Sequence, residues 1–240
     1  MSLIDVIRAW RDPEYRATLS RFYDVARSLP DEGMRHIPRV VEACIELQYG
    51  DPERAQTLLA PIGHDDPSPA NTDLQAARAL MLLQLGDVEQ ALAILEREYQ
   101  QADNDGPFMN VGSRLALAYA MAKRPSDALR VIGELEQRAG GTYHDRLTAL
   151  WAEGAARLQL GEGDPAAPVG AAHAIATGTD APLEHAIAAL ARAHLLESLG
   201  DRDAAEARAD ASRQLAALDI TAAGWSRVFT QAFGAPTPTA

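Results

Sequence analysis

A helix-turn-helix pattern returns five times along this chain at nearly constant intervals. Successive turns are 36, 37, 38 and 39 residues apart. They lie at Gly50-Asp51, Gly86-Asp87, Lys123-Arg124-Pro125, Gly161-Glu162 and Gly200-Asp201. A repeat of this length is typical of proteins that stack helical hairpins one upon another, rather than of proteins that enclose one globular core. The pattern therefore predicts a stack of about five hairpins.

Small residues occupy the same two places in every unit, one on each side of the turn. Seven residues before the turn stand Ala43, Ala79, Ala116, Gly154 and Ala193. Five residues after it stand Ala55, Ala91, Ala128, Ala166 and Ala205. Two helices approach closely only where neither carries a bulky side chain, so we predict that these residues lie between the helices of each hairpin. The alternative is an alanine-rich helical bundle in which this register has no meaning.

One unit carries a motif that resembles a known family. The segment Gly86-Asp87-Val88-Glu89-Gln90-Ala91-Leu92, followed by Leu95, is similar to the tetratricopeptide repeat, and Tyr119 matches the aromatic residue of that family's first helix. The resemblance covers about residues 34–217, although the units exceed the usual length of about 34 residues and lack the family's tryptophan. It implies an all-α, right-handed superhelix. Because the units are longer than usual, they are more similar to the helical regions of large bacterial transcription activators than to chaperone-docking modules.

The apolar periodicity divides the chain into four parts. Residues 1–33 are interpreted as a half-repeat or as N-terminal capping helices, and a cut from a longer solenoid is the other possibility. Residues 34–217 hold the hairpins, which we expect at 34–49 with 52–61, 71–85 with 88–101, 109–122 with 125–138, 143–160 with 165–177, and 181–199 with 202–217. Residues 218–233 are interpreted as a C-terminal capping helix, and residues 234–240 as a disordered tail.

Two of these segments carry further expectations. Pro165, Pro168 and Gly170 crowd the first turns of the helix at 165–177, so we expect that helix to fray or to shift. The C-terminal segment places Trp225, Phe229 and Phe233 on one face at positions i, i+4 and i+8. Such a face covers the exposed apolar edge of the last hairpin or, alternatively, docks on a neighbouring chain.

Composition limits the classes of partner and the compartment. The formal net charge is −12 and the sequence pI is about 4.9, which argues against nucleic acid and against anionic membrane surfaces as partners. Cys44 is the single cysteine, so an internal disulfide is impossible and a reducing compartment is the simplest assumption. We find no signal peptide and no apolar run of 18 residues, and these observations favour a cytoplasmic protein.

Motifs for catalysis, cofactors or metals are not found in the sequence. No phosphate-binding loop of the Gly-x-x-x-x-Gly-Lys type is present, and no two histidines stand three or four residues apart, as a helical metal site requires. The turn at Asp103-Asn104-Asp105-Gly106 lacks the bidentate glutamate of a calcium loop. We therefore expect no enzymatic activity, no cofactor and no metal.

In the tetratricopeptide family the first helix of each unit lines a concave groove, and the resemblance implies the same here. The expected partner-binding residues are Val40, Cys44, Leu80, Leu83, Leu117, Met121, Trp151, Leu158, Leu190 and His194. The basic clamp of chaperone-binding members is absent, which leaves a mostly apolar groove. Its leucines are equally explained as core between neighbouring hairpins. Trp151 and His194 are the better candidates for contact, because each joins an apolar body to a polar group.

These observations favour a non-enzymatic scaffold that binds an apolar or amphipathic protein segment, such as an amphipathic helix, in its concave groove. Three occupants are open at this point: the protein's own terminal helices, a second copy of the chain, or a segment of a partner. The alternative function is the ligand-sensing or regulatory helical region of a larger bacterial signalling or transcription-regulating protein.

Overall fold

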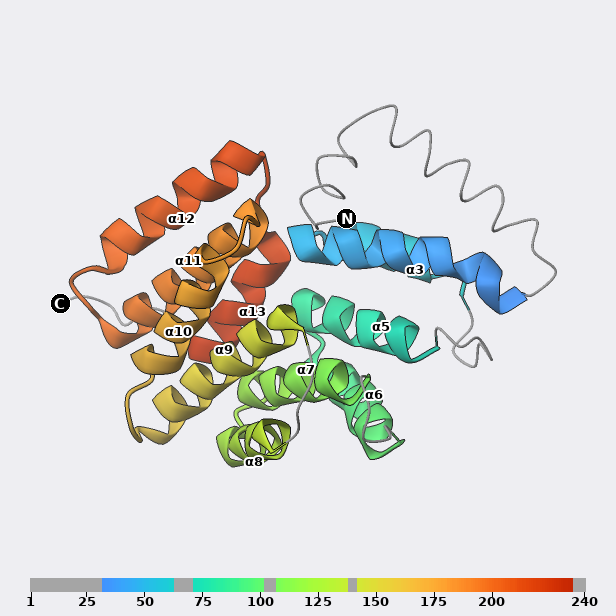
Figure 1. The fold of residues 1–240 in the computed structure, drawn as a ribbon, viewed down its shortest axis with the longest axis horizontal. Coiled ribbons are helices and arrows are strands. Elements are labelled where there is room, and N and C mark those ends of the chain that lie inside the picture. The colour runs from blue at the N-terminus through green and yellow to red at the C-terminus, as the bar shows by residue number, and fades with distance from the viewer. Residues whose placement is uncertain (1–31, 63–70, 102–106, 138–141, 235–240) are drawn as a thin grey trace.

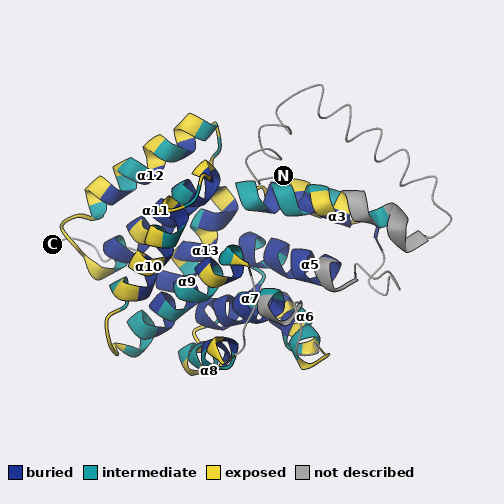
Figure 2. Ribbon diagram, in the orientation of Figure 1, coloured by how far each residue is buried: buried dark blue, intermediate teal, exposed yellow. Residues whose placement is uncertain are grey.

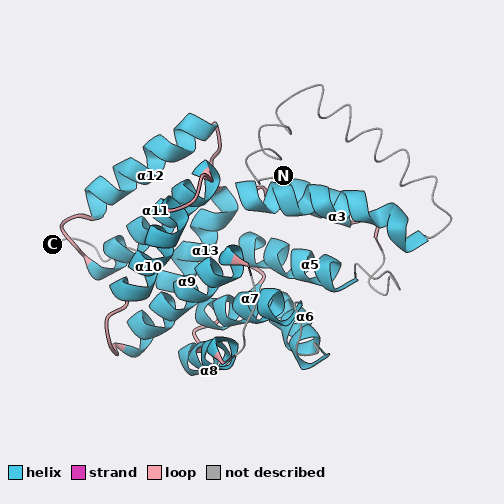
Figure 3. Cartoon of the chain, viewed as in Figure 1, coloured by secondary structure: helices cyan, strands magenta, loops and turns pink. Residues whose placement is uncertain are grey.

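The computed structural model describes residues 32–62, 71–101, 107–137 and 142–234, and all regular secondary structure in these residues is helical (Figure 3). The eleven helices are α3 (Glu32–Tyr49), α4 (Pro52–Leu59), α5 (Asn71–Leu85), α6 (Val88–Gln101), α7 (Pro107–Met121), α8 (Pro125–Glu136), α9 (Tyr143–Leu160), α10 (Ala166–Thr177), α11 (Pro182–Leu199), α12 (Ala204–Leu218) and α13 (Ala223–Phe233). The predicted all-α class is confirmed. The expectations for the N-terminal half-repeat and for the tail fall on residues 1–31 and 235–240, outside the described residues.

Consecutive helices pack in pairs, and each pair packs on the next (Figure 1). Contacts join α3 to α4, α5 to α6, α7 to α8, α9 to α10 and α11 to α12. Further contacts join the second helix of each of the first four pairs to the following helix. Helices α5 and α7 are buried along most of their described length, whereas much of α12 is exposed (Figure 2). Within the described ranges, none of the helices is long and apolar enough to cross a membrane.

The same turn geometry closes the first helix of each pair. The turn residue has positive φ in all five cases, at Gly50 (76°), Gly86 (91°), Lys123 (59°), Gly161 (66°) and Gly200 (64°). In each turn its N–H and the next N–H donate back to carbonyls of the last helical turn, as Gly86 N does to Leu83 O (3.1 Å) and Asp87 N to Leu82 O (2.9 Å). This pair of hydrogen bonds satisfies carbonyl groups at the end of the helix that would otherwise lack donors. All five turns lie where the sequence pattern predicts them.

Most of the small residues lie in the interior, as the register predicts. Ala43, Ala79, Ala116, Gly154 and Ala193 are all buried, and so are Ala55, Ala91 and Ala128. The prediction is wrong for the second place in the last two pairs, where Ala166 is half-buried and Ala205 is exposed. In α12 the buried position passes to Ala207, because residues 201–203 form an extra turn before the helix begins.

Helices α9 and α10 approach each other closely at Gly154. A Cβ atom built on Gly154 would lie 2.5 Å from Val169 Cγ2 and 3.0 Å from the carbonyl oxygen of Pro165. Atoms of real side chains do not come so near, so only glycine fits there. The spacing of α9 and α10 therefore depends on the absence of a single methyl group.

Helix α10 is continuous despite its prolines, so of the two expected effects, fraying or a shift, the structure shows no break in the helix. It begins at Ala166 and continues to Thr177, with Pro168 in its first turn. The first four N–H groups of a helix have no intrahelical acceptor, so a proline there removes no hydrogen bond. Pro168 is instead buried, next to Val169 on the side that faces α9.

We predict opposite effects for the same substitution at two helical glycines. Gly154→Ala forces α9 and α10 apart and lowers the free energy of unfolding by about 1–3 kcal/mol. Gly133→Ala, in α8, places its methyl group in open space and raises the free energy of unfolding by up to about 1 kcal/mol through helix propensity. Urea unfolding followed by circular dichroism measures both values, and equal effects of the two substitutions would contradict the close approach.

Candidate functional site

The C-terminal helix α13 lies among the first helices of several pairs, and not on the last pair alone. It contacts α5, α7 and α9 as well as α11 (Figure 1). At its start, Gly224 N donates to the carbonyl oxygen of Gly50 (2.9 Å), and Trp225 Nε1 donates to that of Gln48 (3.1 Å). The helix thus also reaches the end of α3. We call the surfaces of α3, α5, α7, α9 and α11 that face α13 the inner face.

Aromatic side chains of α13 meet Trp151 of the inner face. The ring centroid of Trp151 lies 5.7 Å from that of Trp225 and 5.2 Å from that of Phe229, both in edge-to-face geometry. Phe229 stacks on Phe233 at 6.1 Å and is completely buried. Edge-to-face and offset pairs of this kind add roughly 0.5–1.5 kcal/mol each to the free energy of burial. The apolar part of the inner face is therefore filled by the chain's own aromatic residues.

Polar side chains of the inner face hold the carbonyl end of α13. Lys123 Nζ donates to the carbonyl oxygen of Gln231 (2.6 Å), and Gln159 Nε2 donates to that of Ala232 (2.7 Å). Ser198 Oγ donates to the carbonyl oxygen of Gly234 at 3.2 Å. The last carbonyls of a helix have no intrahelical donors and carry partial negative charge, which a lysine at this end complements. Three different first helices, or the turns that follow them, thus fix one end of α13.

The start of α13 fits closely over a buried amide. Gln84 of α5 is completely buried, and its Nε2 donates to the carbonyl oxygen of Leu47 at 2.8 Å. A Cβ atom on Gly224 would lie 2.5 Å from Gln84 Oε1. Arg227 also donates to the backbone carbonyl of Gln84. Because the amide is held by its own hydrogen bond, it cannot easily move, so Gly224 is required for the seat of α13.

His194 of α11 is buried beside α13 as a neutral imidazole. Its Nε2 lies 3.2 Å from Ser226 Oγ and 3.4 Å from Arg208 Nη1. Burial, followed by the positive charge of Arg208, lowers the pKa of His194 to about 4, whereas Glu197 acts in the opposite direction. Arg208 and Glu197 themselves form an ion pair, with Nε 2.6 Å from Oε1. His194 therefore contacts α13 without charge at neutral pH.

Part of the inner face stays open as a small cleft beside the start of α13. Its volume is about 50 Å³, room for a few water molecules. All of its walls come from first helices and from α13. The lining residues are Gln48, Leu80, Arg114, His144, Asp145, Leu147, Thr148, Trp151, Leu183, Glu184, Ile187 and Trp225. This cleft is the candidate ligand site among the described residues, because it joins an apolar floor to several polar side chains.

Glu184 is the most unusual group in the cleft. It lies in the first turn of α11, is only 4% exposed, and accepts a hydrogen bond from Tyr143 Oη at 3.2 Å. His144 Nδ1 lies 3.7 Å from the same carboxylate oxygen. Burial raises the pKa of Glu184 and lowers that of His144. Both shifts favour the uncharged forms, so the cleft disfavours isolated charge on its own side chains.

The structure distributes the ten predicted partner-binding residues over several environments. Eight are buried: Val40, Leu80, Leu83, Leu117, Met121, Trp151, Leu190 and His194. Cys44 and Leu158 are half-buried and pack against the same core. Of the ten, Leu80 and Trp151 line the cleft, and Trp151 and His194 touch rings of α13. While α13 is in place, the buried residues are closed to a partner.

Sequence reasoning missed the polar wall of the cleft. Glu184, His144 and Arg114 had no pattern that set them apart from the solvated charges of an acidic, arginine-rich chain. The available signal was weak: Glu184 opens the strongly apolar segment that becomes α11. For α13 the signal was the aromatic spacing, which identified a buried face and left its location open.

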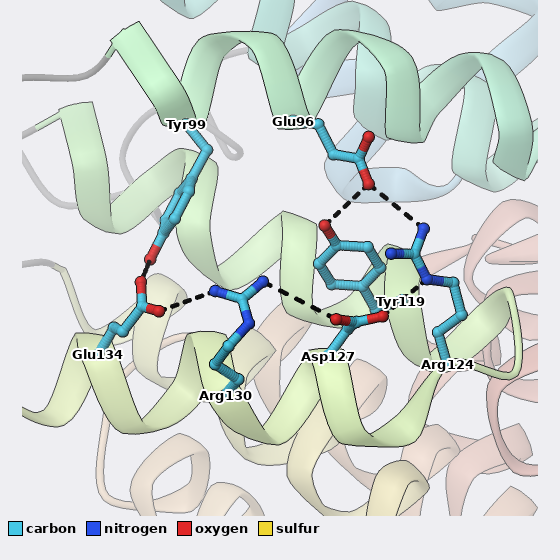
Figure 4. Close-up of polar contacts among 7 residues, drawn as sticks. All are labelled: Glu96, Tyr99, Tyr119, Arg124, Asp127, Arg130 and Glu134. Atoms are coloured by element: carbon cyan, nitrogen blue, oxygen red, sulfur yellow. Dashed lines mark hydrogen bonds and ion pairs between the residues drawn. The ribbon is translucent and has the colours of Figure 1, made fainter.

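A second set of polar contacts joins α6, α7 and α8 (Figure 4). Hydrogen bonds and ion pairs connect Tyr99, Glu134, Arg130, Asp127, Arg124, Glu96 and Tyr119. Burial, followed by the hydrogen bond to Glu96 (2.8 Å), raises the pKa of Tyr119 to about 12. Positive and negative side chains alternate along this network, and none of its residues lines the cleft. We therefore conclude that the network holds α6, α7 and α8 together.

The described part of the chain contains no group of three or more histidine, cysteine, aspartate or glutamate side chains placed to hold a metal ion. Comparisons with known proteins add no assignment. No family model matches this sequence, and neither a curated protein nor a solved structure matches it significantly. The function must therefore be argued from the inner face itself.

We predict that His194 makes stability depend on pH. With a folded pKa of about 4 and an unfolded value near 6.5, the unfolded chain binds more protons between these values, so the free energy of unfolding falls as pH drops through this window. His194→Gln removes this contribution, and the wild-type protein should lose on the order of 1–3 kcal/mol more than the variant between pH 7 and pH 4.5. Urea titrations at both pH values measure it, and parallel losses would contradict the prediction.

Proposed function

We propose that this chain is a non-enzymatic protein-protein interaction scaffold of the tetratricopeptide-like type. In this proposal the paired helices form a right-handed superhelix of five hairpins, and the inner face is its concave groove. The recurrent left-handed turns and the buried small residues support the architecture, and the acidic charge supports a protein partner rather than nucleic acid or a membrane. A cytoplasmic location belongs to the same proposal.

The seat of α13 is the observation that carries this function. An amphipathic helix lies on the inner face with its aromatic side inward and its carbonyl end held by Lys123, Gln159 and Ser198. A surface that receives one amphipathic helix so specifically is suited to receive another with the same pattern. We infer that a partner's amphipathic helix binds the inner face by replacing α13.

The same arrangement also permits self-association by exchange of α13 between two copies. Helix α13 is the last described helix, and only residues 219–222 connect it to α12. Two copies that exchange this helix would each bury the same aromatic residues and would form a symmetric dimer. Light scattering distinguishes such a dimer from the binding of a partner.

A second candidate function is a ligand-sensing or regulatory region of a larger bacterial signalling protein. The cleft beside α13 favours it, because apolar side chains and the polar side chains of Glu184, His144 and Arg114 line that cleft together. Ligand contacts at Trp151 would act directly on the aromatic residues of α13.

We predict that loosening α13 exposes the inner face to a helix supplied from outside. The probe is a fluorescent peptide of residues 221–234. Gly224→Ala drives a methyl group against Gln84, which weakens the seat of α13 by about 1–3 kcal/mol. The peptide should therefore bind this full-length variant at least about tenfold more tightly than it binds the wild-type protein, as measured by fluorescence anisotropy.

Two controls accompany this experiment. Gly133→Ala carries the same substitution in open space and should bind the peptide as the wild-type protein does. A peptide with alanine in place of Trp225, Phe229 and Phe233 should not bind. If Gly224→Ala keeps its helical circular dichroism and still binds the peptide no better than the wild-type protein, the inner face is not a groove for exchangeable helices.

A further inference from the structure

The two ends of the inner face differ in their hydrogen-bonding groups. Where α13 begins, the inner face presents backbone carbonyl groups from the ends of α3 and α5. The carbonyl oxygen of Gly50 accepts from the backbone N–H of Gly224 at 2.9 Å. The carbonyl oxygen of Gln84 accepts from the guanidinium group of Arg227. We call this part of the inner face the acceptor end.

Where α13 ends, the inner face presents donors instead. Lys123 Nζ donates to the carbonyl oxygens of Gln231 and Ala232, at 2.6 and 3.3 Å. Gln159 Nε2 donates to the carbonyl oxygens of Ala232 and Ala120, at 2.7 and 2.8 Å. Both amide protons of Gln159 are therefore in use, which fixes the orientation of that side chain. We call Lys123 and Gln159 the donor end.

The charge of Lys123 makes the donor end specific for the carbonyl end of a helix. Among the described residues no carboxylate lies within ion-pair distance of its ammonium group, which contacts only backbone carbonyl oxygens. The last carbonyls of a helix are free acceptors with partial negative charge, whereas the first N–H groups are free donors with partial positive charge. A helix that lay in the opposite direction would therefore place donors and positive charge against Lys123.

The acceptor end adds a requirement for glycine. A Cβ atom on Gly224 would lie 2.5 Å from Gln84 Oε1 and 2.9 Å from Gln84 Cδ, and Gln84 is completely buried. The residue after this glycine is Trp225, the first of the three aromatic residues that α13 turns inward. In chain order, a glycine thus directly precedes aromatic residues at positions i, i+4 and i+8.

We propose that the inner face selects its partner helix by direction. The partner is an amphipathic helix whose carbonyl end meets Lys123 and Gln159, and which carries glycine directly before the first of three aromatic residues at i, i+4 and i+8. A helix in the opposite direction would leave free N–H groups facing donors and free carbonyl groups facing acceptors, at a cost for each buried group without a partner. This inference rests on the proposed function, the replacement of α13 by a partner's helix, and it names the class of partner.

A peptide with reversed residue order separates direction from apolar pattern. The probes are the fluorescent peptide of residues 221–234 and its reversed form, both with blocked ends; they share composition and the four-residue spacing of aromatic residues. The native-order peptide should bind full-length Gly224→Ala at least about tenfold more tightly, as measured by fluorescence anisotropy. Competition by α13 weakens both peptides by the same factor, so the wild-type protein should give the same ratio. The ratio can therefore be measured even if Gly224→Ala does not fold.

Substitutions within the peptide test the glycine. Alanine in place of the peptide's Gly224 favours helix formation in solution, yet it should weaken binding at least about tenfold, because its methyl group meets Gln84. Thr230 lies on the exposed side of α13, and alanine at that position of the peptide should not weaken binding. Equal effects of the two substitutions would overturn the requirement for glycine.

Lys123 reports the direction of the bound peptide, because it is the only lysine in the chain. Gln231 and Lys123 line one open groove, so glutamate in place of the peptide's Gln231 should form an amide with Lys123 Nζ when a carbodiimide takes up the released water. Glutamate in place of the peptide's Ala223 lies about 12 Å away along the helix and should not react with Lys123. Mass spectrometry of the digested complex locates the crosslink, and preferential crosslinking of the second peptide would overturn the proposed direction.

The failure of this inference is distinguishable from that of the proposed function. If the reversed peptide binds as tightly as the native-order peptide, the inner face does not select direction, whereas the binding of amphipathic helices stands. If neither peptide binds the wild-type protein or the folded Gly224→Ala variant, the inner face is not a groove for helices and both proposals fail.

Discussion

The close approach of paired helices is the constraint on which the rest of this structure depends. Buried small residues in each first helix, together with a left-handed turn residue, allow the second helix to return along the first with almost no space between them. This contact fixes the orientation of each first helix and therefore decides which of its side chains face inward. Gly154 shows the limit of the arrangement, because even one methyl group at that position would meet Val169 and Pro165.

Helix α13 converts these separate inward surfaces into one connected core. Its aromatic residues contact Trp151 in the middle of the chain, and its two ends are held by groups from α3 at one extreme and α11 at the other. In a stack of hairpins each unit normally contacts only its neighbours. Here a single helix ties together units that are far apart in sequence, so a change at its seat acts on several pairs at once.

The sequence was a good guide to local structure because the signals for turns and helix ends are local. Gly50, Gly86 and Gly200 mark positive φ directly. The aspartates after the first two of these glycines, Asp51 and Asp87, directly precede the next helix. The error at Ala205 arose from residues 201–203, whose extra turn shifts the register by two positions. Such a shift has no signature in the spacing of small residues.

The candidate site was harder to foresee because it depends on which distant elements meet. The spacing of Trp225, Phe229 and Phe233 identified a buried face but not the surface that buries it. Glu184 resembled the many solvated acids of this chain until the packing of α9 against α11 placed Tyr143 beside it. Burial of a charged residue is a property of the tertiary structure, and a single sequence records it only faintly.

Lys123 occupies the one turn of the five where glycine is missing, and it is the only lysine in the chain. Its ammonium group both satisfies the terminal carbonyls of α13 and lies at the molecular surface, where burial nevertheless lowers its pKa. Acylation of this side chain would remove its charge and two of its three protons. The chain thus presents a single lysine side chain, and covalent chemistry at its one nitrogen atom would reach the anchoring of the last described helix.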